Sequence, residues 1–583
     1  MRNILGLTVL GLVMAYPVRA EQPLYISFPP DNYKTTSDRI FFIGTAPQQG
    51  EVLVNGKAIA RSGAGHFAPS FPLQVGDNLF ALRYQNQEIK IKVTRTLNQP
   101  SPIQGLEFGK DSLTPNVDIA RLPGEPVCFG AQAPPNANVS VKLGSRTIPL
   151  TYQEQAVALP SNLAALTQQN QPQTIVGAGQ YVGCTAFAAS GNLGSPQFQL
   201  SRNNQTVSQT GAGKVQILSP AQPDVAEVIV DSGIARTGAS TDYSRLTPLP
   251  KGTRASITGR EGDWLRLDYG GWINSKEVRI LPGSVPPVSL IRSVIARKVA
   301  GATEVRFPLQ VPVPMTVQER DRSLVLTLYN TTAQTDIVRT DDDPVISRLD
   351  WQQVAPRVVQ YTFNLKSQQQ WGYKLNYDGT SLVLSLRHPP NLAQQSNQPL
   401  SGIKIVLDPG HGGGESGARG PTGYPEKDVT LIMSKLVAEQ LRARGATVYL
   451  TRETDKTVSL PDRVAMIDKQ QPAIALSIHY NSLPDSGDAL NTQGFGAFWY
   501  HAQAHSLAVF LHNYIVQSAG RPSYGVFWDN LALARPTTAP SVLLEVGFMS
   551  NPTEFEWVTN PQEQQKMAGA IAEGITQWFR VAR

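Results

Sequence analysis

The chain changes its pattern of hydrophobic and polar positions near residue 402. Before that point, short strand-like runs such as IFFIG, EVLVNG and IKIKVTR alternate with turn residues. Regular short strands separated by turns are typical of β-sandwiches and barrels. After residue 402, continuous apolar runs such as IKIVLDPG alternate with segments of helical spacing, the longest from 426 to 444. The pattern predicts several all-β modules followed by a C-terminal α/β domain with a mostly parallel sheet and helices on both faces.

Turn-rich stretches between these runs predict the domain boundaries. The polar segments 203–213 and 390–401 are expected to be linkers. The folded units are then a β-sandwich module at 21–98, a second β module at 99–205, an SH3-like β-barrel at 213–282, a further β module at 288–389 and the α/β domain at 402–583.

Residues 1–20 have the pattern of a cleaved secretory signal peptide. Arg2 precedes an apolar stretch from Ile4 to Tyr16, and small residues occupy the positions before a cleavage site after Ala20. The apolar stretch is shorter than the about 20 residues of a membrane span, and no later stretch reaches that length. The alternative is an N-terminal core strand. A signal peptide predicts an exported protein of the periplasm or cell envelope, with no transmembrane segment.

The charged residues and the cysteines indicate which partners and which covalent cross-links to expect. Lys and Arg number 51 against 45 Asp and Glu, a net charge of +6, and like charges never form a concentrated run. Nucleic acid is therefore not an expected partner. The chain has only two cysteines, Cys128 and Cys184. An exported protein permits a disulfide between them, and two buried free thiols are the alternative.

Four polar residues of the α/β domain are expected to converge on one edge of its sheet. His411, His479 and Glu545 each follow or close a predicted strand, and Glu426 opens the long helix. Ligand sites in such sheets lie at the carboxyl ends of the strands. Two imidazoles and one carboxylate suit Zn²⁺ and leave a position for water, and a second carboxylate can carry protons. Other candidates remain open, namely Glu415, Asp428 and His501.

Residues 403–579 resemble the zinc-dependent N-acetylmuramoyl-L-alanine amidases of the Amidase_3 family. The matching stretches are IVLDPGHGG, GARG, EKDVTL, VYLTRETD, VSLPDRV, SIHYNS and PSVLLEVGFMSN. The resemblance implies that His411, Glu426 and His479 bind one Zn²⁺ and that Glu545 is the catalytic carboxylate. It also implies hydrolysis of the amide between N-acetylmuramic acid and the L-alanine of the peptidoglycan stem peptide. Tyr480 departs from the family, which often has Ala there.

Two upstream units also resemble known modules. Residues 225–281 resemble a bacterial SH3-like domain through ARTGASTDYSRLTPLPKGT and GDWLRLDYGGWI. Its aromatic residues Trp264, Tyr269 and Trp272 either stack on a ligand or belong to the core. Residues 288–388 resemble the AMIN-type envelope-targeting modules that precede cell-wall amidases. The resemblance implies peptidoglycan, and envelope or division proteins, as partners, with a role in cell-wall remodelling or daughter-cell separation.

Further residues of the α/β domain have expected supporting roles. Asp408 is expected behind the metal ligands, where it fixes the His411 tautomer or caps its loop. Asn481 and Arg463 are expected to contact substrate. The segments 482–493 and 520–540 contain Pro and Gly and are expected to be loops, too short to form a helix that blocks the site. Residues 402–583 alone are therefore expected to hydrolyse peptidoglycan without an activator.

Two other classes of protein fit parts of the sequence. One is a non-catalytic envelope-binding protein, but the intact set of two histidines and two glutamates argues against it. The other is a zinc peptidase that cuts within the stem peptide. The metal site alone does not separate a peptidase from an amidase, and only the family resemblance favours the amidase.

Overall fold

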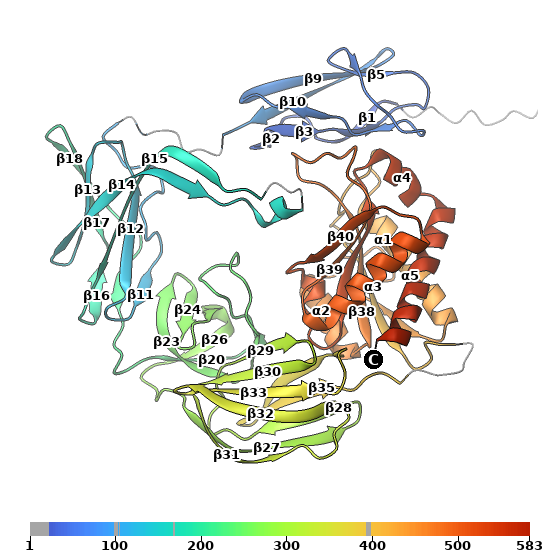
Figure 1. Cartoon of the computed structure of the whole chain (residues 1–583). Helices are drawn as coiled ribbons and strands as arrows, with labels where there is room; N and C mark the ends of the chain where they lie inside the picture. The colour runs from blue at the N-terminus through green and yellow to red at the C-terminus, as the bar shows by residue number, and fades with distance from the viewer. Residues whose placement is uncertain (1–22, 98–102, 104, 167–169, 392–397, 583) are drawn as a thin grey trace, which may run out of the picture.

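The computed structural model describes residues 23–97, 103, 105–166, 170–391 and 398–582. The predicted signal peptide 1–20 lies outside the described residues. Within the described ranges, no helix combines the length and apolar character needed to cross a membrane. The chain passes through several β modules into a C-terminal α/β domain, which confirms the fold class (Figure 1).

The first β module is built from short strands in three sheets. These have the orders β2-β10-β9-β5-β6, β1-β4-β7 and β3-β8. Buried Ile40, Phe67 and Leu82 come from different sheets and share one core. The strands are β1 (Tyr25–Phe28), β2 (Tyr33–Thr35), β3 (Arg39–Phe41), β4 (Ile43–Thr45), β5 (Val52–Val54), β6 (Lys57–Ala58), β7 (His66–Phe67), β8 (Ser70–Pro72), β9 (Gly76–Tyr84) and β10 (Gln87–Arg95).

The second β module contains a six-stranded sheet of order β12-β15-β14-β13-β17-β18. Cys128 and Cys184 lie opposite each other on β12 and β15 and form a disulfide. The long β14–β15 hairpin extends toward the C-terminal domain, with η1 near its tip (Figure 1). The elements are β11 (Ile119–Arg121), β12 (Pro126–Gln132), β13 (Asn138–Leu143), β14 (Arg146–Ala158), η1 (Asn162–Ala165), β15 (Gln173–Ala186), β16 (Gly191–Gly194), β17 (Gln197–Arg202) and β18 (Gln205–Thr210).

The predicted linker 203–213 is wrong, because it contains strand β18. This strand pairs along its whole length with β17 at the edge of the sheet. Its side chains are almost all exposed, so QTVSQT has no alternation of apolar and polar residues to mark a strand. Backbone pairing alone defines it. The next strand, β19 (Val215–Ile217), pairs with β11 and β16, so the second module extends past residue 213.

The SH3-like segment continues a sheet of the preceding module. Its strand β23 pairs with β11, in a sheet of order β16-β19-β11-β23-β20-β26. Tyr269 packs on Tyr329 of the following module, while Trp264 and Trp272 lie beside arginine side chains. The elements are β20 (Val225–Val228), β21 (Ser232–Gly233), β22 (Leu249–Pro250), β23 (Arg254–Glu261), β24 (Trp264–Leu267), β25 (Trp272–Asn274), η2 (Ser275–Glu277) and β26 (Val278–Leu281).

The fourth β module consists of two sheets, β31-β27-β28-β35-β34 and β29-β30-β33-β32. Its core is continuous with that of the SH3-like segment, since Val228 and Ile273 join Val305 and Leu326 in one cluster. The strands are β27 (Ser289–Val299), β28 (Ala302–Phe307), β29 (Met315–Arg320), β30 (Ser323–Tyr329), β31 (Thr331–Arg339), β32 (Ile346–Ala355), β33 (Val358–Leu365), β34 (Tyr373–Asp378) and β35 (Ser381–Arg387). Part of the predicted linker 390–401, residues 392–397, lies outside the described residues.

The C-terminal domain has one mixed sheet of order β37-β36-β38-β41-β39-β40. The first four strands are parallel, β39 runs antiparallel to β41, and β40 is parallel to β39. The strands are β36 (Lys404–Pro409), β37 (Thr447–Leu450), β38 (Ile474–Asn481), β39 (Phe495–Trp499), β40 (Ser523–Trp528) and β41 (Ser541–Phe548).

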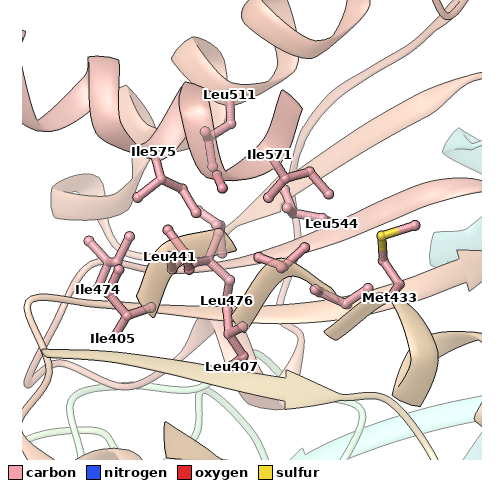
Figure 2. Packing of buried hydrophobic residues seen from close by; sticks show 14 of the residues in the cluster. Ile405, Leu407, Met433, Leu441, Ile474, Leu476, Leu511, Leu544, Ile571 and Ile575 are labelled. Atoms are coloured by element: carbon pink, nitrogen blue, oxygen red, sulfur yellow. The ribbon is translucent and has the colours of Figure 1, made fainter. Parts of the chain in front are cut away.

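Helices cover both faces of this sheet, as expected. The face formed by Ile405, Leu407 and Leu476 packs against α1, α3 and α5 (Figure 2). The opposite face, which includes Val406 and Ala475, packs against α2 and η3. Strand residues alternate between the two faces, which is why the central strands are apolar throughout. The helices are α1 (Glu426–Ala443), α2 (Leu460–Gln470), α3 (Ala502–Ser518), η3 (Ala532–Ala534), α4 (Pro552–Val558) and α5 (Pro561–Val581).

Strand β40 corrects the expectation that 520–540 is a loop throughout. It is an edge strand whose residues are half-buried or exposed, and Gly525 interrupts its apolar run YGVFW. Helix α4 follows Asn551, whose side chain accepts hydrogen bonds from the N–H groups of Thr553 and Glu554. The segment 482–494 contains no helix, as expected.

The packing of the buried sheet face predicts that two leucines contribute very differently to the stability of this domain. Leu476 is 1% exposed in the centre of the core, whereas Leu460 is 55% exposed at the start of α2. We expect Leu476→Ala to lower the free energy of unfolding of this domain by about 2–5 kcal/mol, since it leaves a cavity. Leu460→Ala should change it by less than about 0.5 kcal/mol. Urea denaturation, with hydrogen exchange in β36 and β38 as the probe, measures the free energy of unfolding of both variants. Equal losses of stability in the two variants would contradict this packing.

Candidate active site

The strands of the parallel part of the sheet bring the candidate residues to one edge. Strand β36 ends just before His411, and β38 carries His479 near its carboxyl end. In the parallel ladder between β38 and β41, His479 lies opposite Glu545. Because residues paired in a ladder point to the same face of the sheet, these two side chains are neighbours.

Glu426 lies between the two histidines. Helix α1 begins at this residue, which is 3% exposed. Its Oε1 is 3.0 Å from His479 Nδ1 and its Oε2 is 3.1 Å from His411 Nε2. The same two oxygens accept hydrogen bonds from the backbone N–H groups of Tyr480, at 3.0 Å, and Ala418, at 2.8 Å. The unusual residue Tyr480 therefore contacts the site through its backbone, a contact that any non-proline residue can make.

The two glutamates have opposite electrostatic environments. Burial raises the pKa of Glu426, but its hydrogen bonds with His411 and His479 and their charges outweigh it, so the pKa lies below its ordinary value. Burial, together with the charge of Glu426, raises the pKa of Glu545 well above its ordinary value. Glu426 is therefore suited to remain ionised, and Glu545 is suited to take up and release a proton.

The residues present fit a metal ion. One ligand atom each from His411, Glu426 and His479 lie within 4.8 Å of one another. Glu545 adds a buried Oε2 atom that has no hydrogen-bond partner within the described structure, which leaves it free for a water or substrate group. Two imidazoles and a carboxylate are a ligand set that Zn²⁺ accepts.

Close packing around the site requires glycine at two positions. A side chain at Gly410 would collide with the ring of His479, and one at Gly417 would collide with Glu426 and His411. Gly417 also has a φ of +65°, a conformation that glycine adopts without steric cost. These glycines allow the loop from His411 to α1 to lie directly against the ligands.

Two buried arginines hold the loop that carries His411. Arg463 donates to the carbonyl oxygens of Pro409, at 2.7 Å, and His411, at 2.6 Å. Arg452 donates to Pro409 O at 3.0 Å and to Gly410 O at 2.9 Å. His411 has a φ of +58°, which is unfavourable for a residue with a Cβ atom, and these hydrogen bonds stabilise that backbone.

The structure changes the expected roles of Asp408 and Arg463. Arg463 is 2% exposed, and all three of its guanidinium nitrogens donate to protein atoms, so it does not face a substrate. Asp408 accepts hydrogen bonds from Arg463, Thr451 and Ser477 rather than from the His411 ring. Both residues thus position the His411 loop from behind. Asn481 is half-buried two residues beyond His479, and its contact with substrate stays a prediction.

The other candidate ligands named from the sequence do not belong to this cluster. His501 follows β39, which runs antiparallel to β41, so it lies at the opposite edge of the sheet. There its Nδ1 is 3.2 Å from Glu319 of the fourth module, and its Nε2 is 2.9 Å from Arg535 O. Glu415 is exposed in the loop after His411, and its charge contributes to raising the pKa of that histidine. Neither it nor Asp428 belongs to the cluster of potential ligands in the described residues.

Sequence reasoning missed Arg452 and Tyr524. Arg452 follows β37 within the quoted stretch VYLTRETD, and that position at a strand end was the available signal. Tyr524 lies on the edge strand β40, next to Gly496, which pairs with Glu545. Burial and the charge of Glu545 raise the pKa of Tyr524. Its place beside the site depends on the order of strands in the sheet, which local sequence does not contain.

The fold and the site together place a possible metal site at one edge of an α/β sheet, next to a further carboxylate. Two histidines and a glutamate place their ligand atoms within 4.8 Å of one another at the strand-end edge, beside Glu545, whose Oε2 atom is buried. Residues 405–577 match the family model for N-acetylmuramoyl-L-alanine amidase (Amidase_3), and residues 231–279 match that for the bacterial SH3 domain. The C-terminal domain therefore belongs to the Amidase_3 family, and the chain also carries a bacterial SH3 domain.

Individual relatives match the same part of the chain. The probable cell wall amidase LytH of Staphylococcus epidermidis is 37% identical over 186 residues, which are 32% of this chain and 61% of LytH. The Staphylococcus aureus protein of that name is 37% identical over 187 residues. The chain thus spans about three fifths of the length of these curated relatives.

Solved structures of similar sequence are also amidases. The catalytic domain of CwlV, an N-acetylmuramoyl-L-alanine amidase from Paenibacillus polymyxa, is 32% identical, with 31% of this chain and 99% of that chain covered and a TM-score of 0.29. The amidase AmiC2 of Nostoc punctiforme is 33% identical, with the same shares covered and a TM-score of 0.29.

Because Arg463 holds the loop that carries His411, changing it should weaken metal binding. We expect Arg463→Lys to weaken Zn²⁺ binding about 10–100-fold, because lysine cannot serve the four acceptors of Arg463 with the fixed geometry of a guanidinium. Arg580→Lys, on the exposed end of α5, is the matched control and should bind as tightly as the wild type. Competition with a chromophoric chelator gives the affinity, and circular dichroism checks the fold. Unchanged affinity in a folded Arg463→Lys chain would contradict a positioning role.

Proposed function

We propose that the chain is a peptidoglycan hydrolase that cleaves the amide between N-acetylmuramic acid and the L-alanine of the stem peptide. The observation that carries the proposal is the cluster of three ligand atoms within 4.8 Å, next to Glu545, in a domain of the Amidase_3 family. The proposed cofactor is one Zn²⁺ per catalytic domain, held by His411, Glu426 and His479. Three protein ligands leave a coordination position for water.

The chain's own residues divide the chemistry between them. Bound Zn²⁺ supplies a Lewis acid that lowers the pKa of water and polarises the carbonyl of the amide. Glu545 accepts the proton of the attacking water and delivers it to the leaving L-alanine nitrogen. The raised pKa of Glu545 supports this role, because the group must hold a proton for part of the cycle. Asn481 is the proposed substrate contact beside the ligands.

The proposed place of action is outside the cytoplasm, in the periplasm or cell envelope. The signal-like segment 1–20, the disulfide and the names of the Staphylococcus relatives support it. We propose that the β modules bring the catalytic domain to peptidoglycan or to envelope or division proteins. The activity then serves cell-wall remodelling or daughter-cell separation.

The products of digestion test the reaction. A soluble muropeptide is incubated with the Zn²⁺-loaded chain, and the released fragments are analysed by mass spectrometry. We expect intact stem peptides with a free L-alanine amino group, and no activity after removal of the metal with a chelator until Zn²⁺ is added back. Cleavage within the stem peptide would identify a peptidase, and full activity in excess chelator would exclude the zinc mechanism.

The assigned roles predict different results for two variants. Glu545→Gln should retain Zn²⁺, because its three ligands remain, but should lose about 10²–10⁴-fold in kcat, the usual contribution of general acid–base catalysis. His479→Ala should lose both metal and activity. Zinc content measured by atomic emission, together with the rate on a soluble muropeptide, separates the two effects. Loss of zinc from Glu545→Gln would show that Glu545 is itself a ligand.

A further inference from the structure

The first β module contacts the segment that follows each of the three strands of the site. The loop 410–425 follows β36, the loop 482–494 follows β38, and helix α4 follows β41. All three leave the sheet at the edge where His411, His479 and Glu545 lie. In Figure 1 the module, in blue, lies above this end of the C-terminal domain, close to α4.

Asp485 is the main polar contact between the module and the loop 482–494. Its carboxylate accepts a hydrogen bond of 2.7 Å from Thr35 Oγ1 and bonds of 3.1 and 3.2 Å from the hydroxyl of Tyr33. Tyr33 and Thr35 are the two ends of strand β2. Burial, together with Asp485, raises the pKa of Tyr33 to about 12, so its hydroxyl remains a donor at any working pH.

An apolar patch extends this contact. Phe41, Ile43 and Ala68 of the module are buried together with Ala489 of the loop, and Leu483 packs against them. Phe28 packs against this patch, and its ring lies 5.3 Å from that of Tyr33. The loop that follows His479 is thus held between the module on one side and its own strand on the other.

The other two segments meet the module through fewer atoms. The side chain of Glu556 in α4 accepts a hydrogen bond of 2.8 Å from the N–H of Ala64, and the rings of His66 and Phe555 lie 5.3 Å apart. The hydroxyl of Tyr25 lies against Gly423 in the loop between His411 and Glu426. These contacts span the edge from β36 to β41.

A second module also reaches this part of the molecule. Leu166, near the tip of the β14–β15 hairpin, accepts a hydrogen bond of 3.2 Å through its carbonyl oxygen from the hydroxyl of Tyr524. The ring of Tyr524 lies against Gly496, which pairs with Glu545 in the sheet. The hairpin therefore borders the site next to the proposed catalytic carboxylate.

We propose that the docked first β module selects substrates by size: it admits short soluble muropeptides to the site and excludes the cross-linked, insoluble wall until it is released. The inference rests on the proposed function. A stem peptide must approach the ligands from the strand-end edge, and the module contacts all three segments that form this edge. A glycan strand embedded in a cross-linked network needs far more room there than a single muropeptide.

The test uses the full Zn²⁺-loaded chain on two substrates, insoluble peptidoglycan and a soluble disaccharide-pentapeptide. Asp485→Ala removes the acceptor of Tyr33 and Thr35. We expect it to raise the rate on insoluble peptidoglycan about tenfold, the factor that corresponds to about 1.4 kcal/mol of docking free energy. The rate on the soluble substrate should stay within about twofold, because the proposed ligands and Glu545 are unchanged.

Two further variants test whether the change in rate comes from the contact between Asp485 and the first module. Asp488→Ala removes a carboxylate from the same loop, one that bonds only to Asn491 within the loop, and should leave both rates unchanged. Tyr33→Phe/Thr35→Val weakens the same contact from the module side and should reproduce Asp485→Ala. Hydrogen exchange reports release directly, as faster exchange at 64–68 and 482–494 with unchanged protection in β9 and β10.

The outcomes separate this inference from the proposed function. A wild-type chain with no activity on the soluble substrate would overturn the proposed function itself. Activity on the soluble substrate, with release of the module but no gain on insoluble peptidoglycan, would overturn only the size selection. An equal fall of both rates would instead make Asp485 a support of the loop. If Asp485→Ala does not release the module, Ala68→Arg in the apolar patch forces release and decides between these results.

Discussion

A buried carboxylate needs partners for both of its oxygens, and the way Glu426 obtains them fixes the geometry of the site. One oxygen contacts His479 and the adjacent N–H of Tyr480, and the other contacts His411 and the N–H of Ala418. These four contacts join helix α1, strand β38 and the loop after β36. Without these partners, the ionised carboxylate would have to leave the interior or take up a proton. Burial, together with that same charge, raises the pKa of the nearby Glu545.

Much of the C-terminal α/β domain can be predicted from sequence, because its helices and strands have clear local patterns of apolar residues. Helix α1 and strands β36, β38 and β41 are long, apolar and regularly spaced, and parallel strands place their carboxyl ends together. This was enough to bring His411, Glu426, His479 and Glu545 to one edge. The roles of Asp408 and Arg463 were not accessible in this way, because a polar side chain beside a site can point toward the substrate or away from it. Only the packed structure shows that Arg463 donates all its hydrogen bonds to the protein.

The strands that sequence reasoning missed, β18 and β40, lie at the edges of their sheets and are defined by backbone pairing. Strand β18 has exposed side chains and exists through its pairing with β17, and β40 lies at the edge of a sheet next to β39. Strand β18 has no apolar pattern, and Gly525 interrupts the apolar run of β40. The same limit applies to the edge of the site. Asp485 and Tyr33 are hundreds of positions apart, and each looks like an ordinary polar residue of a loop or a short strand until the fold brings them together.

The first and the fourth β modules are attached to the catalytic domain by different chemistry. The fourth module buries Trp371 in the catalytic core, where it stacks on Phe579 with the rings 6.0 Å apart, and Arg387 donates to the backbone of Gln471, Pro472 and Thr538. Separating them would expose a large aromatic surface and leave buried polar groups without partners. The first module instead meets the domain through a few hydrogen bonds and a small apolar patch around Ala489. Contacts of that kind exchange readily with water and separate at modest cost. The fourth module is therefore a fixed part of the enzyme body, while the first is the one that can move away from the site.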